Sequence, residues 1–361
     1  MIENTNTLKN RSRRVEYFDS LRITATFFVV MIHTVYLYFN KVDVRSSDWA
    51  VFEIYDSLSR WAVPVFVMIS GALFLEREKS AKEIYRKNLV RIIIAYIAWS
   101  FIYAAIFFVR SQNLKASLNC FIKGRYHMWF LVMLGGLYLA TPILRKIAED
   151  KKLVRLFLAL GLVFAGIIPE LTSVLHMIDT SVTQRLADYL KYYTNNAFIF
   201  LPMGFSCYYM LGYALNRYGI SKKLEYLIYI LGLSGLGVTI FATLSRSLSL
   251  NRPYTGFFNY TTLNVAAMAA AVFVLFKKHF NRSGGSYPRL TELKRALSKY
   301  SFGVYMVHVA IVELLTVTFR VDPLSFNPIL SAPAICVSVT IISFIISAVI
   351  NHIPVLKKYI V

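Results

Sequence analysis

The segment SLRITATFFVVMIHTVYLYF, residues 20–39, indicates the fold class. It has the length of helix that crosses the hydrocarbon core of a bilayer. Similar apolar runs recur along the chain and are separated by short polar or basic segments. Of the 361 residues, 57% are hydrophobic and only 16% are charged, whereas a soluble domain has about a quarter charged residues. The sequence therefore predicts an all-α integral membrane protein.

About ten transmembrane helices are predicted, and their even number places both termini on one side. Lys and Arg are concentrated at the termini and in the even-numbered loops, so both termini are predicted to be cytoplasmic. This asymmetry also accounts for the net charge of +21, and no nucleic-acid partner is predicted. The spans lie near residues 20–39, 60–76, 90–109, 127–144, 153–171, 196–215, 224–245, 258–277, 301–319 and 329–351.

The predicted organisation is a single membrane domain. Residues 1–19 form a basic cytoplasmic segment without the apolar stretch of a cleaved signal peptide, residues 20–351 the transmembrane domain, and residues 352–361 a short cytoplasmic tail. The cysteines Cys120, Cys207 and Cys336 are widely spaced, which favours neither a disulfide framework nor a metal site. Membrane lipids are the expected surroundings, and the sequence leaves the oligomeric state open.

The first span carries ionisable residues, which are costly in a bilayer and therefore functional candidates. Arg22 and His33 are eleven residues apart, so they lie within about 20° of one helix face and about 16 Å apart along the axis. Asp19 precedes Arg22 by three residues and can pair with it. A neutral imidazole in a protein-lined cavity suits general base catalysis. The alternative is that Arg22 reaches lipid headgroups and His33 makes one interhelical hydrogen bond.

Two further groups of candidates lie in the second and third spans. Ser70 and Gly71 favour close helix packing over chemistry. The basic residues Arg86, Lys87 and Arg91 precede or open the third span. They either anchor the helix on the cytoplasmic side or bind phosphate groups through charge-assisted hydrogen bonds.

The fourth and ninth spans contribute the remaining candidates. His127 and Trp129 open the fourth span at the outer face, where Trp129 also fits an interfacial aromatic belt. The ninth span carries Tyr305, His308 and Glu313. His308 and Glu313 are five residues apart and do not share a face closely, so each needs its own polar partner. His308 either orients His33 or lines the site, and the alternative for Glu313 is a structural hydrogen-bonding group.

Several of these residues occur in an ordered set of motifs. The set resembles the bacterial acyltransferase family 3, and in particular its single-domain enterobacterial common antigen O-acetyltransferase type. The motifs are Asp19-x-x-Arg22 followed by His33, Phe66-x-x-Ile69-Ser70-Gly71, His127-x-Trp129-Phe130, Tyr138-x-x-x-Pro142 and Ser301-Phe302-Gly303-Val304-Tyr305-x-x-His308.

The resemblance implies a ten- or eleven-helix membrane enzyme of the bacterial inner membrane that O-acylates carbohydrates. The acyl donor would be acetyl-CoA or another acyl-CoA, and the acceptor a surface polysaccharide or lipid-linked sugar. In this reading His33 is the essential histidine, and Arg22 with Asp19 lies near the donor. The donor phosphates would bind Arg86, Lys87 and Arg91, although the basic pair stands further from the next arginine than is usual in the family.

The remaining motifs would line the pore through Ser70, Gly71, His127, Trp129, Tyr305, His308 and Glu313. A transporter or flippase for a small solute or lipid-linked sugar is the alternative, because polar groups at mid-depth in a ten-helix bundle suit a carrier equally well.

Overall fold

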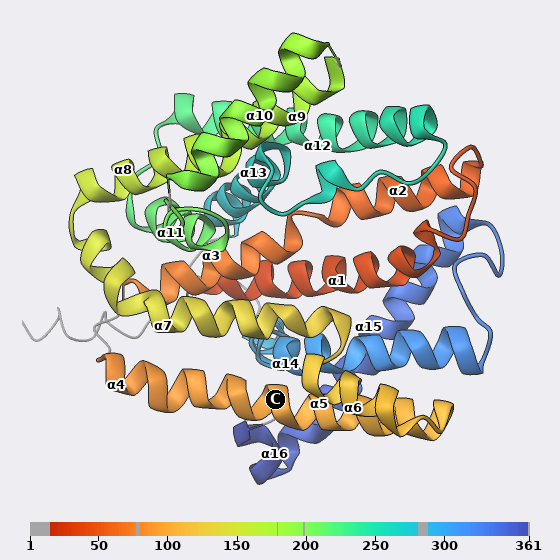
Figure 1. The fold of residues 1–361 in the computed structure, drawn as a ribbon. Coiled ribbons are helices and arrows are strands. Elements are labelled where there is room, and N and C mark those ends of the chain that lie inside the picture. Colours follow the sequence, from red (N-terminus) through yellow and green to blue (C-terminus); the bar gives the residue numbers. More distant parts are fainter. Residues whose placement is uncertain (1–14, 77–79, 179, 198, 281–287, 360–361) are drawn as a thin grey trace, which may run out of the picture.

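The computed structural model describes residues 15–359 except 77–79, 179, 198 and 281–287. In this part of the chain every regular element is helical (Figure 1). The prediction of an all-α, multi-pass membrane protein is thus confirmed. Most of the predicted N-terminal segment and the last two residues of the predicted tail lie outside the described residues, while Glu16 already belongs to the first helix.

The helices follow one another with short connections. The first half of the chain forms α1 (Glu16–Phe39), α2 (Ser47–Ser59), α3 (Ala62–Phe74), α4 (Ala81–Glu83), the π-helical η1 (Ile84–Leu89), α5 (Val90–Ser111), α6 (Leu114–Lys123), the 3-10 turn η2 (Tyr126–Met128), α7 (Trp129–Glu149), α8 (Lys151–Gly161), the π-helical η3 (Leu162–Ile167) and α9 (Ile168–Ile178). The second half forms α10 (Ser181–Asn196), α11 (Phe205–Arg217), α12 (Lys222–Leu250), the 3-10 turn η4 (Gly256–Phe258), α13 (Leu263–His279), α14 (Pro288–Glu313), the π-helical η5 (Leu314–Thr318), α15 (Pro328–His352) and α16 (Pro354–Tyr359).

Within the described residues, nine helical stretches are long and apolar enough to cross a bilayer. They match nine of the ten predicted spans, with boundaries that differ by several residues. The stretches are Glu16–Phe39, Ser47–Phe74, Ala81–Ser111, Leu114–Glu149, Lys151–Ile178, Lys222–Leu250, Gly256–His279, Arg289–Thr318 and Pro328–His352.

The predicted start of the second span at residue 60 is wrong. The helical stretch begins at Ser47 and is interrupted only at Arg60 and Trp61, between α2 and α3. Pro64 explains the interruption, because proline has no N–H to donate to the carbonyl four residues earlier. Residues 47–59, which lie outside the predicted spans, therefore form a helix that is partly buried in the bundle.

The predicted sixth span, 196–215, is also wrong as a full-length span. The helix α10 ends at Asn196, and α11 starts only at Phe205. Between them Gly204 has φ +66°, a left-handed conformation that glycine adopts at little cost. The 13 residues of α11 extend about 20 Å, which is less than the hydrocarbon thickness.

The short helix α11 packs closely against α3, where two glycines permit the contact. A Cβ atom on Gly71 would lie 1.8 Å from the Tyr209 carbonyl oxygen, and one on Gly212 would lie 2.0 Å from the Met68 carbonyl oxygen. Each of the two helices therefore has a glycine that lies directly against the backbone of the other. The predicted role of Gly71 in close helix approach is confirmed.

Helix α1 lies at the centre of the bundle and contacts α2, α3, α13, α14 and α15. Its N-terminal half packs into one buried apolar cluster, which includes Met68, Tyr209 and Phe273. Its C-terminal half packs into a second cluster, which includes Trp49 and Val304. The residues of α1 are thus held in position by surrounding helices along its length.

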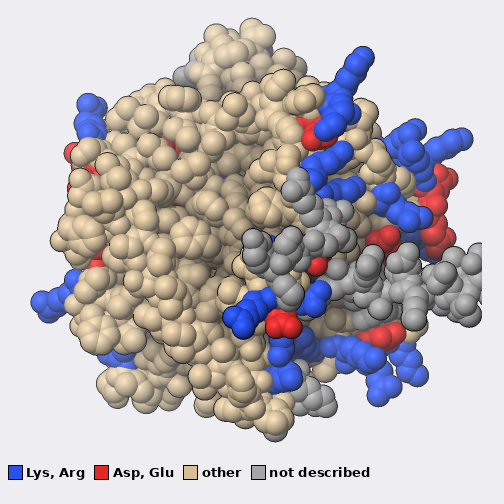
Figure 2. Space-filling view, turned by 180° about the vertical axis from the view of Figure 1, so that it is seen from behind, with Lys and Arg blue, Asp and Glu red and all other residues tan. Residues whose placement is uncertain are grey.

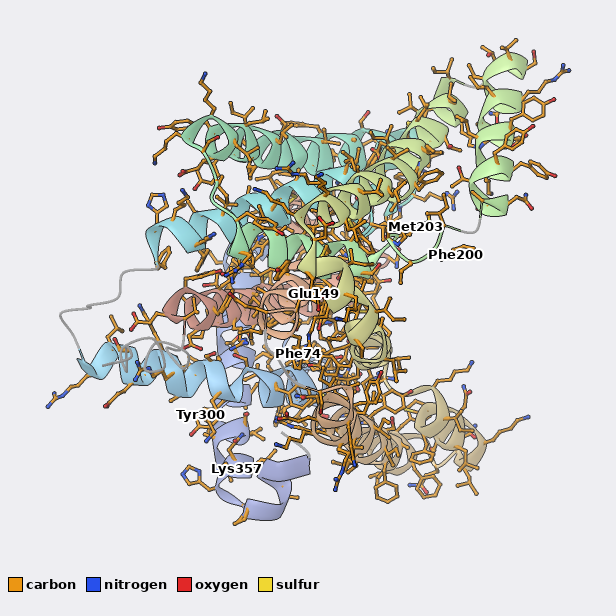
Figure 3. All side chains as sticks on the ribbon, turned by 90° about the vertical axis from the view of Figure 1, so that its left-hand side faces the viewer. Phe74, Glu149, Phe200, Met203, Tyr300 and Lys357 are labelled. Atoms are coloured by element: carbon orange, nitrogen blue, oxygen red, sulfur yellow. The ribbon has the colours of Figure 1, made fainter. Side chains whose placement is uncertain are left out.

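The surface is organised by charge. Lys and Arg side chains gather at one end of the molecule, on the right of Figure 2, and most of the remaining visible face is uncharged in the described residues. This end holds the start of α4 and is the one predicted to be cytoplasmic. The pair α9–α10 projects from the rest of the bundle in two perpendicular views (Figures 1 and 3).

Candidate active site

A cavity of about 350 Å³ follows one face of α1. Five α1 residues line it at helical spacing, from Arg22 through Thr26, Val29 and Val30 to His33. The structure thus brings both ionisable residues of the first span to the same chamber. Further walls come from α3, η1, α5, η2, α7, α14 and Tyr260.

Three histidines from different elements meet in this cavity. The ring centroid of His33 lies 5.0 Å from that of His308 and 6.2 Å from that of His127, and the latter two rings are 5.3 Å apart. His127 and His308 are almost completely buried. Sequence spacing alone could not have brought together residues from α1, η2 and α14.

Several nitrogens of these rings have no hydrogen-bond partner among the described residues. They are Nδ1 of His33, both ring nitrogens of His127 and Nε2 of His308. The other nitrogen of His308 does have a partner, because its Nδ1 lies 3.1 Å from the Val304 carbonyl oxygen. Buried polar atoms without partners are costly, so this cluster is suited to receive a polar ligand.

The cavity also carries cations. Arg22, Arg91 and Lys299 line it together with Asn88. The guanidinium of Arg22 lies 3.8 Å from the carboxylate of buried Asp19, as the sequence spacing suggested. Cations grouped in this way can bind phosphate groups.

Two of the predicted phosphate-binding residues lie elsewhere. Arg86 and Lys87 are exposed in η1 and are not among the lining residues, and Lys87 pairs with Glu83 at 3.2 Å. Sequence reasoning missed Lys299 as a phosphate-binding residue, because it lies in α14, about two hundred residues after Arg91 in the sequence. Its position at the start of the ninth span was interpreted only as a positive-inside signal.

Aromatic side chains form another part of the wall. The rings of Trp129 and Tyr260 stack with a centroid distance of 5.8 Å and an interplanar angle of 27°. Tyr305 lines the cavity and donates a hydrogen bond to the His127 carbonyl oxygen at 2.7 Å. Trp129 is 40% exposed, so its ring is accessible as well as stacked.

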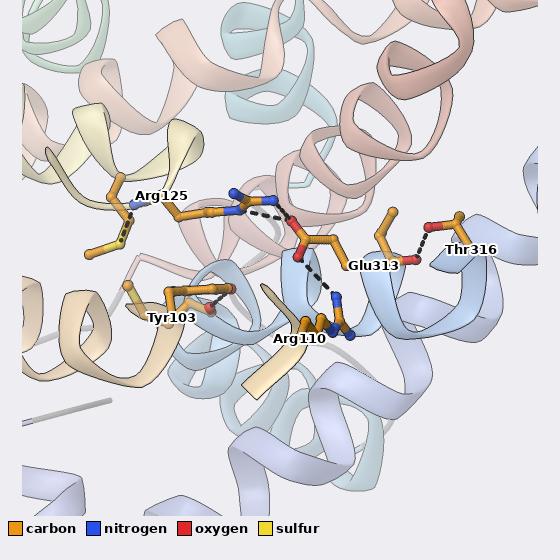
Figure 4. A network of polar contacts seen from close by, with 8 residues as sticks. Tyr103, Arg110, Arg125, Glu313 and Thr316 are labelled. Carbon is orange, nitrogen blue, oxygen red and sulfur yellow. Dashed lines mark hydrogen bonds and ion pairs between the residues drawn. The ribbon is translucent and has the colours of Figure 1, made fainter. Parts of the chain in front are cut away.

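Of the other residues predicted to line the pore, one lines the cavity and two do not. Ser70 lines the cavity, although its hydroxyl donates to the Phe66 carbonyl oxygen at 2.9 Å. Gly71 faces α11 instead. Glu313 is not a lining residue and pairs with Arg125 and, at 3.6 Å, with Arg110 (Figure 4). This network joins the end of α14 to α5 and to the segment just before His127.

A buried charged group on α2 and at its C-terminal end was missed by sequence reasoning. Glu53, Asp56 and Arg60 are all buried, and Arg60 pairs with Asp56. The Arg60 guanidinium also lies over the rings of Phe258 at 4.4 Å and Tyr260 at 5.9 Å. Glu53, Asp56 and Arg60 follow one another at spacings of three and four residues, which places them on one face of a helix. A helix predicted before residue 60 would therefore have revealed the group.

The described residues contain no group of three or more His, Cys, Asp or Glu side chains arranged to hold a metal ion. What they contain is a chamber with imidazole side chains in one part and the cations Arg22, Arg91 and Lys299 lining it as well. Such a chamber can take a proton from a hydroxyl group and hold an anionic substrate.

Comparisons with known proteins identify the family of this chain. A family model described as an acyltransferase domain, that of acyltransferase family 3, matches residues 15–348. No curated protein and no solved structure matches the chain. Because the match covers nearly the whole sequence, the chain belongs to acyltransferase family 3 and is a multi-pass membrane acyltransferase.

Proposed function

We propose that this protein is an O-acyltransferase that uses acyl-CoA, with acetyl-CoA as the first candidate. The acceptor is a hydroxyl group of a surface polysaccharide or lipid-linked sugar, the membrane is the bacterial inner membrane, and His33 is the general base. The observation that carries the proposal is the single cavity shared by His33 and the cations Arg22, Arg91 and Lys299.

The donor binds with its phosphates at the cationic part of the cavity. Arg22 and Arg91 supply guanidinium groups, which can hold phosphate oxygens through two parallel hydrogen bonds, and Lys299 adds a further charge. The pantetheine arm then extends along the face of α1 that lines the cavity, from Arg22 toward His33. The axial separation of Arg22 and His33, about 16 Å, keeps the phosphate groups away from the reacting thioester.

The reaction is a direct acyl transfer. The acceptor oxygen attacks the thioester carbonyl carbon while His33 takes the hydroxyl proton, a new carbon–oxygen bond forms, and the carbon–sulfur bond breaks. The coenzyme A thiolate leaves and is protonated by the imidazolium or by water. A positioned general base contributes about 10²–10⁴-fold to such a rate.

The acceptor lies against the aromatic wall. Trp129 and Tyr260 present stacked rings beside the histidine cluster, and a flat aromatic surface suits the apolar face of a sugar ring. The ring of Trp129 is exposed enough to be reached from outside the bundle. The acceptor therefore approaches the thioester from the side opposite the phosphates.

The test begins with purified protein in lipid nanodiscs and labelled acetyl-CoA. Wild-type protein should bind the donor and transfer label to glycans, and His33→Ala should lose at least about 10²-fold in transfer rate while still binding donor. His279→Ala is the matched control, because His279 is exposed at the end of α13. Normal transfer by a well-folded His33→Ala protein would refute the base assignment. A carrier, in contrast, would neither bind nor cleave acetyl-CoA.

A further inference from the structure

The tautomer of His308 is fixed by the backbone of its own helix. Its Nδ1 lies 3.1 Å from the Val304 carbonyl oxygen, one turn earlier in α14. A carbonyl oxygen can only accept a hydrogen bond, so the proton is on Nδ1. A neutral imidazole carries one N–H, and the remaining nitrogen, Nε2, is therefore an acceptor. The side chain is fully buried, so this state is isolated from bulk water.

The Nε2 atom of His308, which can accept a hydrogen bond, lies in a cluster of side chains that can donate one. The nearest histidine ring is that of His33, with the centroids 5.0 Å apart and the planes tilted by 44°. Both Nε2 of His308 and Nδ1 of His33 are enclosed and have no partner among the described residues. The two nitrogens form no direct hydrogen bond with each other, and one water molecule between them would satisfy both.

The third ring of the cluster is less well suited to this contact. His127 lies 5.3 Å from His308 and 6.2 Å from His33 between centroids. Both of its nitrogens lack partners, so the structure gives its tautomer no preference. Tyr305 lies 6.1 Å from His308, but its hydroxyl already donates to the His127 carbonyl oxygen. Of the three rings, that of His33 lies nearest to His308, at 5.0 Å between centroids.

We propose that His308 is a positioning residue that accepts the Nδ1–H of His33 through one bridging water molecule and so leaves Nε2 of His33 as the bare, proton-accepting nitrogen. The chain of contacts runs from the Val304 carbonyl oxygen through His308 to His33 and then to the acceptor hydroxyl. During transfer the hydroxyl proton moves to Nε2 of His33, and His308 stays neutral. The tautomer assignment stands without the proposed function, whereas its catalytic consequence rests on it.

The size of the effect follows from comparable chemistry. A catalytic histidine that loses the group fixing its tautomer can lose about 10⁴-fold in kcat when that group is a carboxylate. His308 is neutral and contributes orientation without charge, so we expect a loss of about 10²-fold. The KM for acetyl-CoA should not change, because His308 belongs to the histidine cluster and carries no charge toward the phosphates.

Two substitutions separate positioning from packing. His308→Phe keeps a ring of similar size but removes the acceptor, whereas His308→Gln keeps a carbonyl oxygen that can accept from His33. A positioning role predicts that kcat falls about 10²-fold in the Phe variant and is largely retained in the Gln variant. If the Phe variant is as active as the Gln variant or more so, His308 only fills space and the proposal is overturned.

The direct readout is nitrogen NMR of the protein with labelled histidine rings in lipid bilayers. Among the signals of the six histidines, that of His33 is identified by its loss in His33→Ala and its retention in His279→Ala. His33 should carry its proton on Nδ1 in the wild type and become a mixture of tautomers in His308→Phe. A proton on Nε2 of His33 in the wild type, or an unchanged signal in the Phe variant, would overturn the proposal. Absence of acetyl transfer in the wild type would instead refute only the proposed function.

Discussion

The crossing of α3 and α11 offers a sharp test of the packing described above. In Gly71→Ala the new methyl group would lie 1.8 Å from the Tyr209 carbonyl oxygen and 2.5 Å from its carbon, whereas ordinary contact begins near 3.4 Å. These are backbone atoms and cannot rotate away. The two helices would therefore have to separate by roughly 1.5 Å, against the close packing of the core.

Overpacking of this kind costs about 1–3 kcal/mol, and the upper part of that range applies where only backbone can move. For a chain of this length such a loss corresponds to a fall of a few degrees in melting temperature. Fluorescence-detected size-exclusion chromatography after heating in detergent measures it. Because Ser70 lines the cavity, acetyl transfer by Gly71→Ala should fall as well.

The matched control is Gly136→Ala. Gly136 lies within α7, and a Cβ atom there would meet nothing within 4 Å. Alanine is favoured over glycine in a helix interior by about 1 kcal/mol, so this variant should be as stable as the wild type or slightly more stable. Equal melting temperatures for Gly71→Ala and Gly136→Ala would refute the tight crossing.

Three further variants test other contacts. Lys299→Gln should raise the KM for acetyl-CoA about tenfold at unchanged kcat, because one phosphate-binding charge is lost; Lys222→Gln, 77% exposed, is the control. Glu313→Gln should lower the melting temperature by a few degrees, because two arginines lose their shared carboxylate. Asp56→Asn should destabilise the protein by about 3 kcal/mol, because it leaves the buried Arg60 guanidinium without its counter-charge.

Each of these expectations has an outcome that contradicts it. The donor role of Lys299 fails if both lysine variants bind acetyl-CoA equally well. A wild-type melting temperature for Glu313→Gln would mean that the network of Figure 4 does not hold α14 in place. The importance of the Asp56 ion pair is contradicted if Asp56→Asn melts like the wild type.

Local periodicity explains what could be predicted from the sequence. The apolar runs defined nine of the membrane spans, because burial in lipid requires an apolar exterior along a whole helix. The eleven-residue spacing of Arg22 and His33 predicted a shared face, and the two side chains do line one cavity. Both inferences depend only on the geometry of a single helix.

The rest depended on contacts between distant segments. Lys299 reaches the cavity because α14 packs against α1, which no local pattern reveals, whereas His308 was predicted as a pore residue through the resemblance of its motif. The pairing of Asp56 with Arg60 was missed, because Asp56 lies between the first two predicted spans and its charge is compensated only in the folded bundle. Residues 196–215 are mostly apolar and uncharged, so their composition concealed the break at Gly204.

The length of the cavity along α1 has a consequence for compartments. A bilayer's hydrocarbon core is about 30 Å thick, and the stripe from Arg22 to His33 covers about half of that distance. A thioester whose nucleotide stays on the cytoplasmic side would already present its acyl carbon deep in the membrane. Acyl transfer and passage of the acyl group through the membrane would then be one step. The coenzyme A thioester could modify an extracytoplasmic sugar without being exported itself.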